Sequence, residues 1–414
     1  MPCMGFIGAK IFSAIVCVIL WIQNINLMKT IRRTVLLLGC LLHLSWMWAS
    51  APGVTICYHP ASKGMYVGSP SICIMSNGDY IATHDLFANS QTEYNTEVYK
   101  SEDRGLTWER QSVVKGQFWS SVFCISDTLY LIGTDREYGN LVVRRSIDGK
   151  SWTTPSDSHH GLLAEGEYHS APTPVVVHQG RIWKAIEYAK APATTWPMRY
   201  SAMMISVPVG ADLLEAANWT RSVNLHAMPL LKEKVYGWLD GNAVVAPDGN
   251  MVDVMRANTP NGVTEKAAII KVSDDCRELS FDDKDLVDMP GGCKKFTIRY
   301  DSLTHRYWSL VNAAPEGKGS ATGLDVRNYV VLISSPDLRE WTRHATLLAH
   351  PDMKRHAFQY IDWMTEGNDI IYVSRTAYEG PDGELAHSGH DANMLTFHRI
   401  KNFRRLVKKS DGHP

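Results

Sequence analysis

The sequence lacks the motifs that define several large classes of enzyme. It contains no glycine-rich phosphate loop, no Gly-x-Gly-x-x-Gly fingerprint opening a helix and no Gly-x-Ser-x-Gly elbow. These absences argue against a phosphate-loop NTPase, a dinucleotide-dependent oxidoreductase and an α/β-hydrolase. It also has no Cys-x-x-Cys pair and no cluster of Cys and His with the spacing of a zinc site. The sequence therefore predicts neither a cofactor nor a metal site.

The chain has no excess of charge of either sign. Its 414 residues include 42 Lys and Arg against 43 Asp and Glu, and 45% of them are apolar. No run of basic residues offers an electrostatic footprint for nucleic acid, so a nucleic-acid partner is not predicted. These fractions are typical of a globular protein and exclude a disordered or collagen-like chain.

Acidic residues are absent from positions 1–51, which hold two apolar runs, Ile11–Gln23 and Thr34–Trp48. A basic start at Lys29–Arg33, the second apolar run and the small residues Ala49–Ala51 follow one another in the order of a secretory signal peptide. We therefore predict that residues 1–51 are a leader that is removed after export.

The leader allows more than one interpretation. Met28 directly precedes the basic start and is an alternative first residue of the chain. Each apolar run is shorter than the ~20 residues that a membrane-spanning helix needs, which favours a cleaved signal over a membrane anchor. Lipid modification at Cys40 is a further alternative. We expect a mature protein without a membrane span, located in the periplasm or outside the cell.

Five cysteines follow the leader: Cys57, Cys73, Cys124, Cys276 and Cys293. An odd number in a secreted chain leaves at least one thiol free or paired outside the chain. Cys276 and Cys293 are close enough in sequence to close a surface loop through a disulfide. The alternative is that all five thiols are buried as small apolar side chains.

The sequence after the leader repeats one pattern six times. Each copy is an apolar strand, a tight turn and a second strand that ends in a polar residue; the first copy runs from Ser71 to Asp85 around Asn77-Gly78. Asn-Gly between apolar runs favours a hairpin, because both central positions of its turn need a positive φ. Four short strands per copy, with no convincing long amphipathic helix between copies, predict an all-β, six-bladed β-propeller over residues 52–402.

The two ends of this propeller are predicted to meet. The sixth unit lacks a fourth strand after Met394–Ile400, so we expect Val54–Tyr58, just after the leader, to supply it and close the ring. Residues 403–414 are then a basic C-terminal tail.

A second motif recurs where the third strand of a unit turns into the fourth. Ser101–Trp108 reads Ser-Glu-Asp-Arg-Gly-Leu-Thr-Trp, Ser146–Trp152 is a near copy, and Ser335–Trp341 and Ser273–Asp275 are shorter versions. We expect the Asp to accept backbone N–H groups of the turn, the Gly to take a positive φ and the Trp to pack between blades. The pattern resembles the Asp-box, or BNR repeat, of the sialidase superfamily.

This resemblance covers about residues 54–402 and implies a sialidase-like fold in a secreted bacterial protein. It also implies a structural role for the motif aspartates Asp103, Asp148, Asp275 and Asp337. Two superfamily positions differ in this chain. The stretch that matches the carboxylate-binding Arg-Ile-Pro motif reads Val67–Ser71 and has no Arg, and the expected acid/base Asp would fall near Ser90, where the nearest acid is Glu93.

The second strands end in six polar residues, which a propeller brings to one face together with the starts of the first strands. These residues are Asp85, Asp135, Glu187, Arg256, Asn312 and Arg375. We predict that the two arginines, with Asn312, bind substrate, because a guanidinium holds a carboxylate through two hydrogen bonds. Grouped carboxylates repel, so one of the three acids is expected to stay protonated and act as a general acid.

The starts of the first strands add further candidates to the same face. His169 is a candidate general acid or base, and Asp240 and Lys295 are candidate substrate-binding residues. Tyr360 lies on the last blade, where the resemblance to sialidases implies a nucleophilic Tyr.

Three functions stay open, each with a glycan as partner. The first is an exo-acting glycoside hydrolase on a glycan that contains sialic or uronic acid. The second is a polysaccharide lyase in which arginines neutralise a uronate while His169 and Tyr360 move protons. The third is a glycan-binding propeller without catalysis. The segregation of acids and arginines on the rim favours the hydrolase.

Overall fold

The computed structural model describes residues 50–88, 91–190, 195–227, 235–259, 265–314 and 326–407. From Ala51 onward they belong to one structural unit, while all but the last two residues of the predicted leader lie outside the described residues. No helix in the described part of the chain has the length and apolar character that crossing a lipid bilayer requires.

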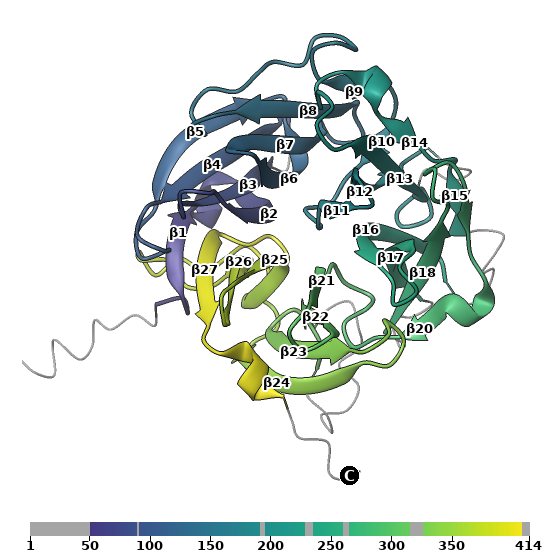
Figure 1. Cartoon of the computed structure of the whole chain (residues 1–414). Helices are drawn as coiled ribbons and strands as arrows, with labels where there is room; N and C mark the ends of the chain where they lie inside the picture. The colour runs from purple at the N-terminus through teal and green to yellow at the C-terminus, as the bar shows by residue number, and fades with distance from the viewer. Residues whose placement is uncertain are drawn as a thin grey trace, which may run out of the picture. The chain divides into compact units, whose positions relative to one another are not determined.

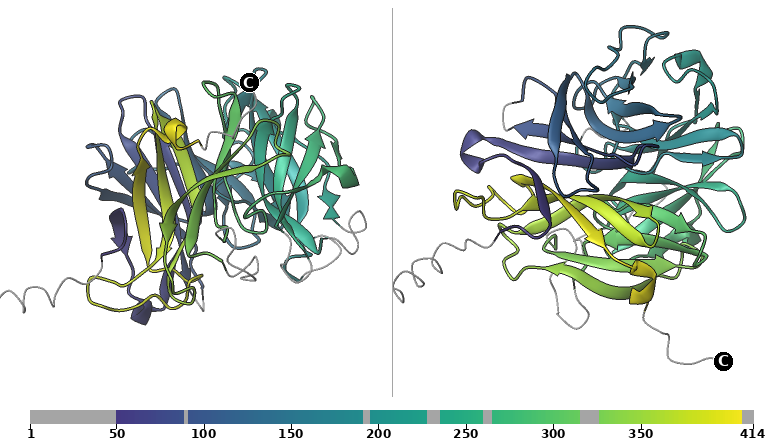
Figure 2. Two further views of the ribbon diagram at one scale, coloured as in Figure 1. Left: turned by 90° about the horizontal axis from the view of Figure 1, so that it is seen from below. Right: turned by 60° about the vertical axis from the view of Figure 1, so that its left-hand side comes forward.

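Six antiparallel sheets stand around a common axis (Figure 1), which confirms the all-β, six-bladed β-propeller. Figure 2 shows the same ring from two other sides. The first blade comprises β2 (Met65–Ile74), β3 (Tyr80–Ala88), β4 (Asn95–Ser101) and β5 (Glu109–Lys115); the second β6 (Phe118–Ile125), β7 (Thr128–Thr134), β8 (Leu141–Ser146) and β9 (Leu162–Ala164); the third β10 (Tyr168–His169), β11 (Val176–His178), β12 (Arg181–Tyr188), β13 (Ser201–Pro208), β14 (Thr220–Arg221) and β15 (Leu225–His226).

The other three blades are antiparallel sheets as well. The fourth comprises β16 (Gly237–Val245), β17 (Met251–Asn258), β18 (Lys266–Val272), β19 (Leu279–Ser280) and β20 (Leu286–Asp288); the fifth β21 (Ile298–Asp301), β22 (Arg306–Val311), β23 (Tyr329–Ser335) and β24 (Thr342–Ala349); the sixth β25 (Ala357–Glu366), β26 (Asp369–Ala377), β27 (Met394–Ile400) and β1 (Val54–Tyr58). Short 3₁₀ turns lie at η1 (Ala61–Lys63), η2 (Ala216–Asn218), η4 (Asp283–Asp285) and η5 (Phe403–Leu406).

The hydrophobic core is divided among the interfaces between neighbouring blades. One apolar cluster, for example, joins Cys73, Ile81 and Val98 of the first blade to Val122 and Leu131 of the second. Five further clusters join the second blade to the third and so on round the ring, the last of them between the sixth blade and the first. A blade alone would leave both apolar faces in water, so the stacking of blades holds the fold together.

The innermost strands of four blades contain the same irregularity. In β2, β6, β16 and β25 the register with the next strand shifts, as at a β-bulge. In each bulge a residue other than Gly takes a positive φ: Ser69 (42°), Trp119 (51°), Asp240 (59°) and Tyr360 (53°). Such a conformation is strained for an L-residue and is typical of functional sites.

Polar side chains two positions after these bulges bond to the next blade. Each bonds the backbone at the inner edge of the neighbouring blade, so the bonds form part of a belt around the axis. Val122 N donates to Ser71 Oγ at 3.1 Å, and Ser121 Oγ donates to Thr173 O at 2.9 Å. Ile298 N donates to Asn242 Oδ1 at 3.0 Å, and Ile72 N donates to Asp362 Oδ2 at 3.1 Å. The belt fixes the blades, and with them the bulges, relative to one another.

The four motif aspartates lie in turns and accept backbone N–H groups there. Asp103 Oδ1 accepts from Leu106 N and Thr107 N, and Asp148, Asp275 and Asp337 do the same in their own turns. Trp108 follows the first of these turns and packs against Phe397 of the sixth blade. These contacts give the motif a local structural role.

The two ends of the described unit meet in the sixth blade. Strand β1 pairs antiparallel with β27, with Val54 opposite Phe397 and Tyr58 opposite Met394. After β27, Phe403 is fully buried and Arg404 Nε bonds Asp301 Oδ2 at 2.9 Å, so the chain packs on the propeller as far as these residues. Positions 408–414 of the predicted basic tail lie outside the described residues.

Of the two alternatives for the cysteines, the disulfide between Cys276 and Cys293 is not formed, since all five cysteines of the propeller are free thiols. Cys73, Cys276 and Cys293 are buried, while Cys57 and Cys124 are half-buried. The side chains of Cys276 and Cys293 are buried in different interfaces: Cys276 donates to Met204 O at 3.4 Å, and Cys293 lies beside Lys294 Nζ at 3.3 Å. Their sequence separation suits a loop, but the chain between them runs through two further short strands.

Candidate functional site

A cavity of about 510 Å³ opens on the face where the bulges point. All four strained residues line it: Ser69, Trp119, Asp240 and Tyr360. Its size and its mixture of aromatic and charged walls are typical of small-molecule sites. The repeated bulge therefore aims one side chain from each of four blades at a common space.

Three arginines from three successive blades line this cavity. Arg256 belongs to β17, Arg327 precedes β23, and Arg375 belongs to β26. Arg256 and Arg375 are each 2% exposed, and the Nε of each is buried without a hydrogen-bond partner among the described residues. A buried donor without a partner is costly, so these atoms suit an anionic ligand.

Tyr360 is surrounded by these guanidiniums. Its ring centroid lies 5.0 Å from Arg375 Cζ and 5.5 Å from Arg327 Cζ. Burial raises the pKa of the Tyr360 phenol, but Arg327 and Arg256 outweigh burial and hold it below its ordinary value, against the opposing charge of Asp240. A phenol with a lowered pKa is a better nucleophile or base near neutral pH.

Asp240 and His169 are both oriented by Glu187. Glu187 Oε2 accepts a hydrogen bond from His169 Nδ1 at 2.6 Å, and its Oε1 accepts one from Gly241 N, in the bulge of Asp240, at 2.8 Å. Asp240 Oδ2 in turn accepts from Arg256 Nη1 at 3.0 Å. Because Nδ1 is engaged, His169 offers Nε2 to the cavity.

Five of the ten predicted site residues come together in this cavity: His169, Asp240, Arg256, Tyr360 and Arg375. The other five do not line it. Glu187 is fully buried and acts through the residues it holds. Asp135 bonds its own loop, accepting from Asn140 N at 2.8 Å and from Asn140 Nδ2 at 3.0 Å.

Asn312 and Lys295 are also bound to the protein itself. Asn312 Nδ2 donates to Phe358 O at 2.7 Å and to Tyr329 O at 2.8 Å, which ties the fifth blade to the sixth. Lys295 Nζ donates to Ile361 O at 2.7 Å, and burial lowers its pKa to about 8. Both side chains are thus used to join blades.

Asp85 is buried beside the cavity wall. Trp119 N donates to its Oδ2 at 2.6 Å, and Thr96 Oγ1 lies 2.7 Å from its Oδ1 and 2.9 Å from Gln117 O. The single hydrogen of the Thr96 hydroxyl can be donated either to Asp85 Oδ1 or to Gln117 O. Burial raises the pKa of Asp85 to about 7, although bonds from Thr96 and Ser69 lower it. Asp85 does not line the cavity, and its pKa is raised by burial and not by the repulsion between grouped carboxylates on which the prediction rested.

Sequence reasoning missed Arg327 and Glu137, both of which line the cavity. Arg327 comes just before the third strand of its blade, and Glu137 lies between β7 and β8. Loops between second and third strands open on the same face as the second-strand ends. Searching those loops for charged residues would have found both.

Comparison with known proteins gives no match to any protein-family model and none to any curated protein. Solved structures do match. The Hadza microbial sialidase Hz136 is 13% identical with a TM-score of 0.56, over 86% of this chain and 69% of that one. The alpha-L-arabinofuranosidase ARB93A from Fusarium graminearum is 10% identical with a TM-score of 0.56, over 86% and 99%. These likenesses show the fold.

A mutant of the NanB sialidase from Streptococcus pneumoniae is a further structural match. It is 10% identical to this chain with a TM-score of 0.53, over 88% of this chain and 73% of that one. The sialidases and the arabinofuranosidase thus share with this chain the propeller fold predicted from its repeats.

Proposed function

We propose that this chain is a glycoside hydrolase that acts on a sugar carrying a carboxylate, such as a sialic or uronic acid. The observation that carries the proposal is the convergence of Arg256, Arg327 and Arg375 on one cavity around Tyr360. The three positive charges of these arginines outnumber the two negative charges of Asp240 and Glu137, the acids that line the same cavity. An anionic substrate would restore the balance and use the unpaired Nε atoms of Arg256 and Arg375.

Tyr360 is the proposed nucleophile. Its phenolic oxygen attacks the anomeric carbon, the bond from that carbon to the leaving oxygen breaks, and Asp240 takes the phenolic proton. Lowering of the phenol's pKa by the arginines supports this role. A water then attacks the same carbon and the bond between that carbon and the Tyr360 oxygen breaks, so the water oxygen stays on the sugar. The water gives a proton to the carboxylate of Glu137, and Asp240 returns its proton to the phenol.

Glu137 is the proposed acid that protonates the leaving oxygen. It is the exposed carboxyl among the cavity-lining residues, whereas Asp240 is 3% exposed. An exo-acting hydrolase places the departing glycan toward solvent, so an acid at the rim suits the step. His169, held by Glu187, is proposed to bind a hydroxyl of the sugar.

The names of the structural matches support hydrolysis of glycosidic bonds, since two are sialidases and one is an arabinofuranosidase. The leader pattern of residues 1–51 supports export, and we propose a periplasmic or extracellular location for the mature chain. A glycan outside the cytoplasm is a substrate that such a protein would meet.

The test is a product screen of the purified chain against sialylated, uronate-bearing and arabinose-bearing glycans. We expect a free acidic sugar as product, with one water molecule added per glycosidic bond cleaved. An unsaturated sugar that absorbs in the ultraviolet would instead indicate a lyase. Saturable binding without any product would indicate a binding protein, and release of arabinose would show that the arginines do not select the substrate.

A further inference from the structure

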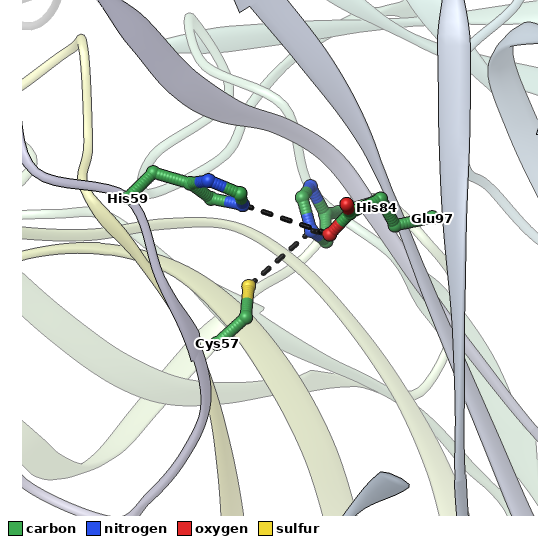
Figure 3. Close-up of side chains that lie close together, drawn as sticks. All are labelled: Cys57, His59, His84 and Glu97. Atoms are coloured by element: carbon green, nitrogen blue, oxygen red, sulfur yellow. Dashed lines mark hydrogen bonds and ion pairs between the residues drawn. The ribbon is translucent and has the colours of Figure 1, made fainter. Parts of the chain in front are cut away.

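Four side chains with metal-binding atoms meet where the first and sixth blades adjoin. Cys57 lies in β1 and His59 just after it, His84 lies in β3, and Glu97 in β4 (Figure 3). One ligand atom from each lies within 4.8 Å of all the others. None of the four lines the arginine cavity, so this cluster is separate from the proposed active site.

Three of the distances between these atoms are close to those of a tetrahedral metal site. His84 Nε2 lies 3.3 Å from Cys57 Sγ and 3.2 Å from Glu97 Oε2, and His59 Nε2 lies 3.6 Å from the same Glu97 oxygen. Ligands bound at about 2.0–2.3 Å to a tetrahedral zinc ion lie roughly 3.3–3.7 Å apart. His59 Nε2 is moreover buried without a hydrogen-bond partner among the described residues.

Contacts outside the cluster orient its members toward its centre. His84 Nδ1 bonds Asp85 O at 2.9 Å, which leaves Nε2 facing Cys57 and Glu97. Glu97 Oε1 accepts from Arg110 Nη1 at 2.9 Å, which turns Oε2 inward. Metal-binding histidines usually hold a carbonyl or carboxylate with their second nitrogen in this way.

The same contacts argue against a Cys-His-acid catalytic triad. In a triad the acid binds the imidazole nitrogen that faces away from the nucleophile. Here Glu97 and Cys57 approach the same nitrogen of His84, and a backbone carbonyl occupies the other. The four atoms converge on one point rather than forming a relay.

We propose that Cys57, His59, His84 and Glu97 bind a zinc ion that fastens strand β1 to the first blade. A thiolate, a carboxylate and two neutral imidazoles balance the charge of Zn²⁺, which suits a buried position. Four protein ligands leave no open position for substrate, so the ion is structural. It would join the strand that completes the sixth blade to β3 and β4 of the first.

Cysteine binds metal as its thiolate, which is the charge counted above. The site could not be predicted from the sequence, because its ligands lie in or just after three strands and are up to 40 positions apart in the chain.

The experiment measures metal in the full chain, produced in medium with zinc and purified without chelator. We expect about one zinc ion per chain, as for a closed four-ligand site. Cys57→Ser and His59→Gln should lower this content severalfold or more. Cys124→Ser and His159→Gln are matched controls, since Cys124 is half-buried in another interface and His159 is exposed beside Glu215, and both should retain the ion.

Cobalt provides a second readout, in which the wild-type chain alone shows whether a thiolate binds the metal. After replacement of zinc by Co²⁺, wild-type chain should show thiolate-to-cobalt absorption in the near ultraviolet, the Cys124→Ser chain should keep it and the Cys57→Ser chain should lose it. A folded wild-type chain with no zinc and no cobalt absorption would overturn the proposal. None of these readouts involves glycan cleavage, so they are independent of the proposed function.

Discussion

Arg327 lies where a single guanidinium can decide the choice of substrate. Its Nη1 donates to Gln359 Oε1 at 2.8 Å, and its Cζ lies over the ring of Tyr360. Burial and the neighbouring Arg256 lower its pKa, which is partly offset by Tyr360. A bound carboxylate would offset the burial and the repulsion by Arg256 that disfavour the charged form of Arg327.

Replacing Arg327 by Lys keeps the charge but removes the planar fork that binds a carboxylate through two bonds. We expect KM for an acidic glycoside to rise about tenfold or more, corresponding to about 1.4 kcal/mol, while KM for any neutral glycoside changes little. Steady-state kinetics on the two substrates measure the difference. Arg145→Lys, at an exposed residue that pairs with Asp212, is the control. Equal losses on both substrates would remove Arg327 from carboxylate binding.

Asp85 gives the protein a pH-dependent stability. Its pKa is raised by burial from 3.8 to about 7, so the folded state holds this proton more tightly than the unfolded state. The contribution to stability is therefore complete below about pH 4 and is lost as the pH rises toward 7, at up to about 1.4 kcal/mol per pH unit.

Asp85→Asn should remove this slope. Its amide oxygen can accept from Trp119 N, and its N–H can donate to Thr96 Oγ1 when the Thr96 hydroxyl donates to Gln117 O. Urea unfolding between pH 4 and 7 should show wild-type stability falling relative to that of the variant. If the two curves stay parallel, Asp85 is ionised in the folded protein at neutral pH.

At the scale of the elements, the belt of bonds around the axis holds the bulged strands in place. Asn242 accepts from Ile298 N at 3.0 Å and donates to Phe296 O at 3.2 Å, linking the fourth blade to the fifth. Asn242→Ala leaves these buried backbone groups unpaired, and should lower the free energy of unfolding by about 1–3 kcal/mol. Asn250→Ala, in an exposed turn of the same blade, should change it by less than about 0.5 kcal/mol. The two variants are compared by their midpoints of unfolding in denaturant. Equal changes of the midpoint in both variants would contradict the role of the belt.

The elements also show how far the sequence could predict the site. Turn chemistry such as Asn77-Gly78 fixes where hairpins occur, so the six blades follow from local residues. The bulges do not follow, because Asp240 and Tyr360 adopt a positive φ that no local preference of Asp or Tyr requires. That conformation is held by contacts between blades, such as Gly241 N to Glu187 Oε1.

The sequence positions of the second-strand ends predicted that these residues share one face of the propeller. They did not predict the direction in which each side chain points. Arg256 and Arg375 lie within their strands and reach the cavity, whereas Asp135 and Asn312 satisfy backbone groups nearby. Whether a polar residue serves a ligand or its own loop depends on distances that only the folded chain sets. For this reason both arginines predicted at second-strand ends line the cavity, whereas none of the acids predicted at second-strand ends does.

For the whole molecule, the ring is only as stable as the junction between its first and last blades. Without β1 the sixth sheet would expose β27 as an edge, and Ile56 would no longer cover the cluster that contains Val67 and Phe397. A chain that begins at Pro60 should therefore aggregate or unfold at lower denaturant than one that begins at Ser50. Light scattering and urea titration test this, and equal behaviour of the two chains would show that closure through β1 is dispensable.

The function of the whole molecule depends on Tyr360 forming a bond to the sugar. The most direct measurement uses a fluorinated analogue of the acidic sugar, which slows hydrolysis of a covalent intermediate, followed by mass spectrometry of the digested protein. We expect one added sugar on the peptide that contains Tyr360, and none in the Tyr360→Phe variant. An adduct on Asp240 or Glu137, or continued hydrolysis by Tyr360→Phe, would contradict it.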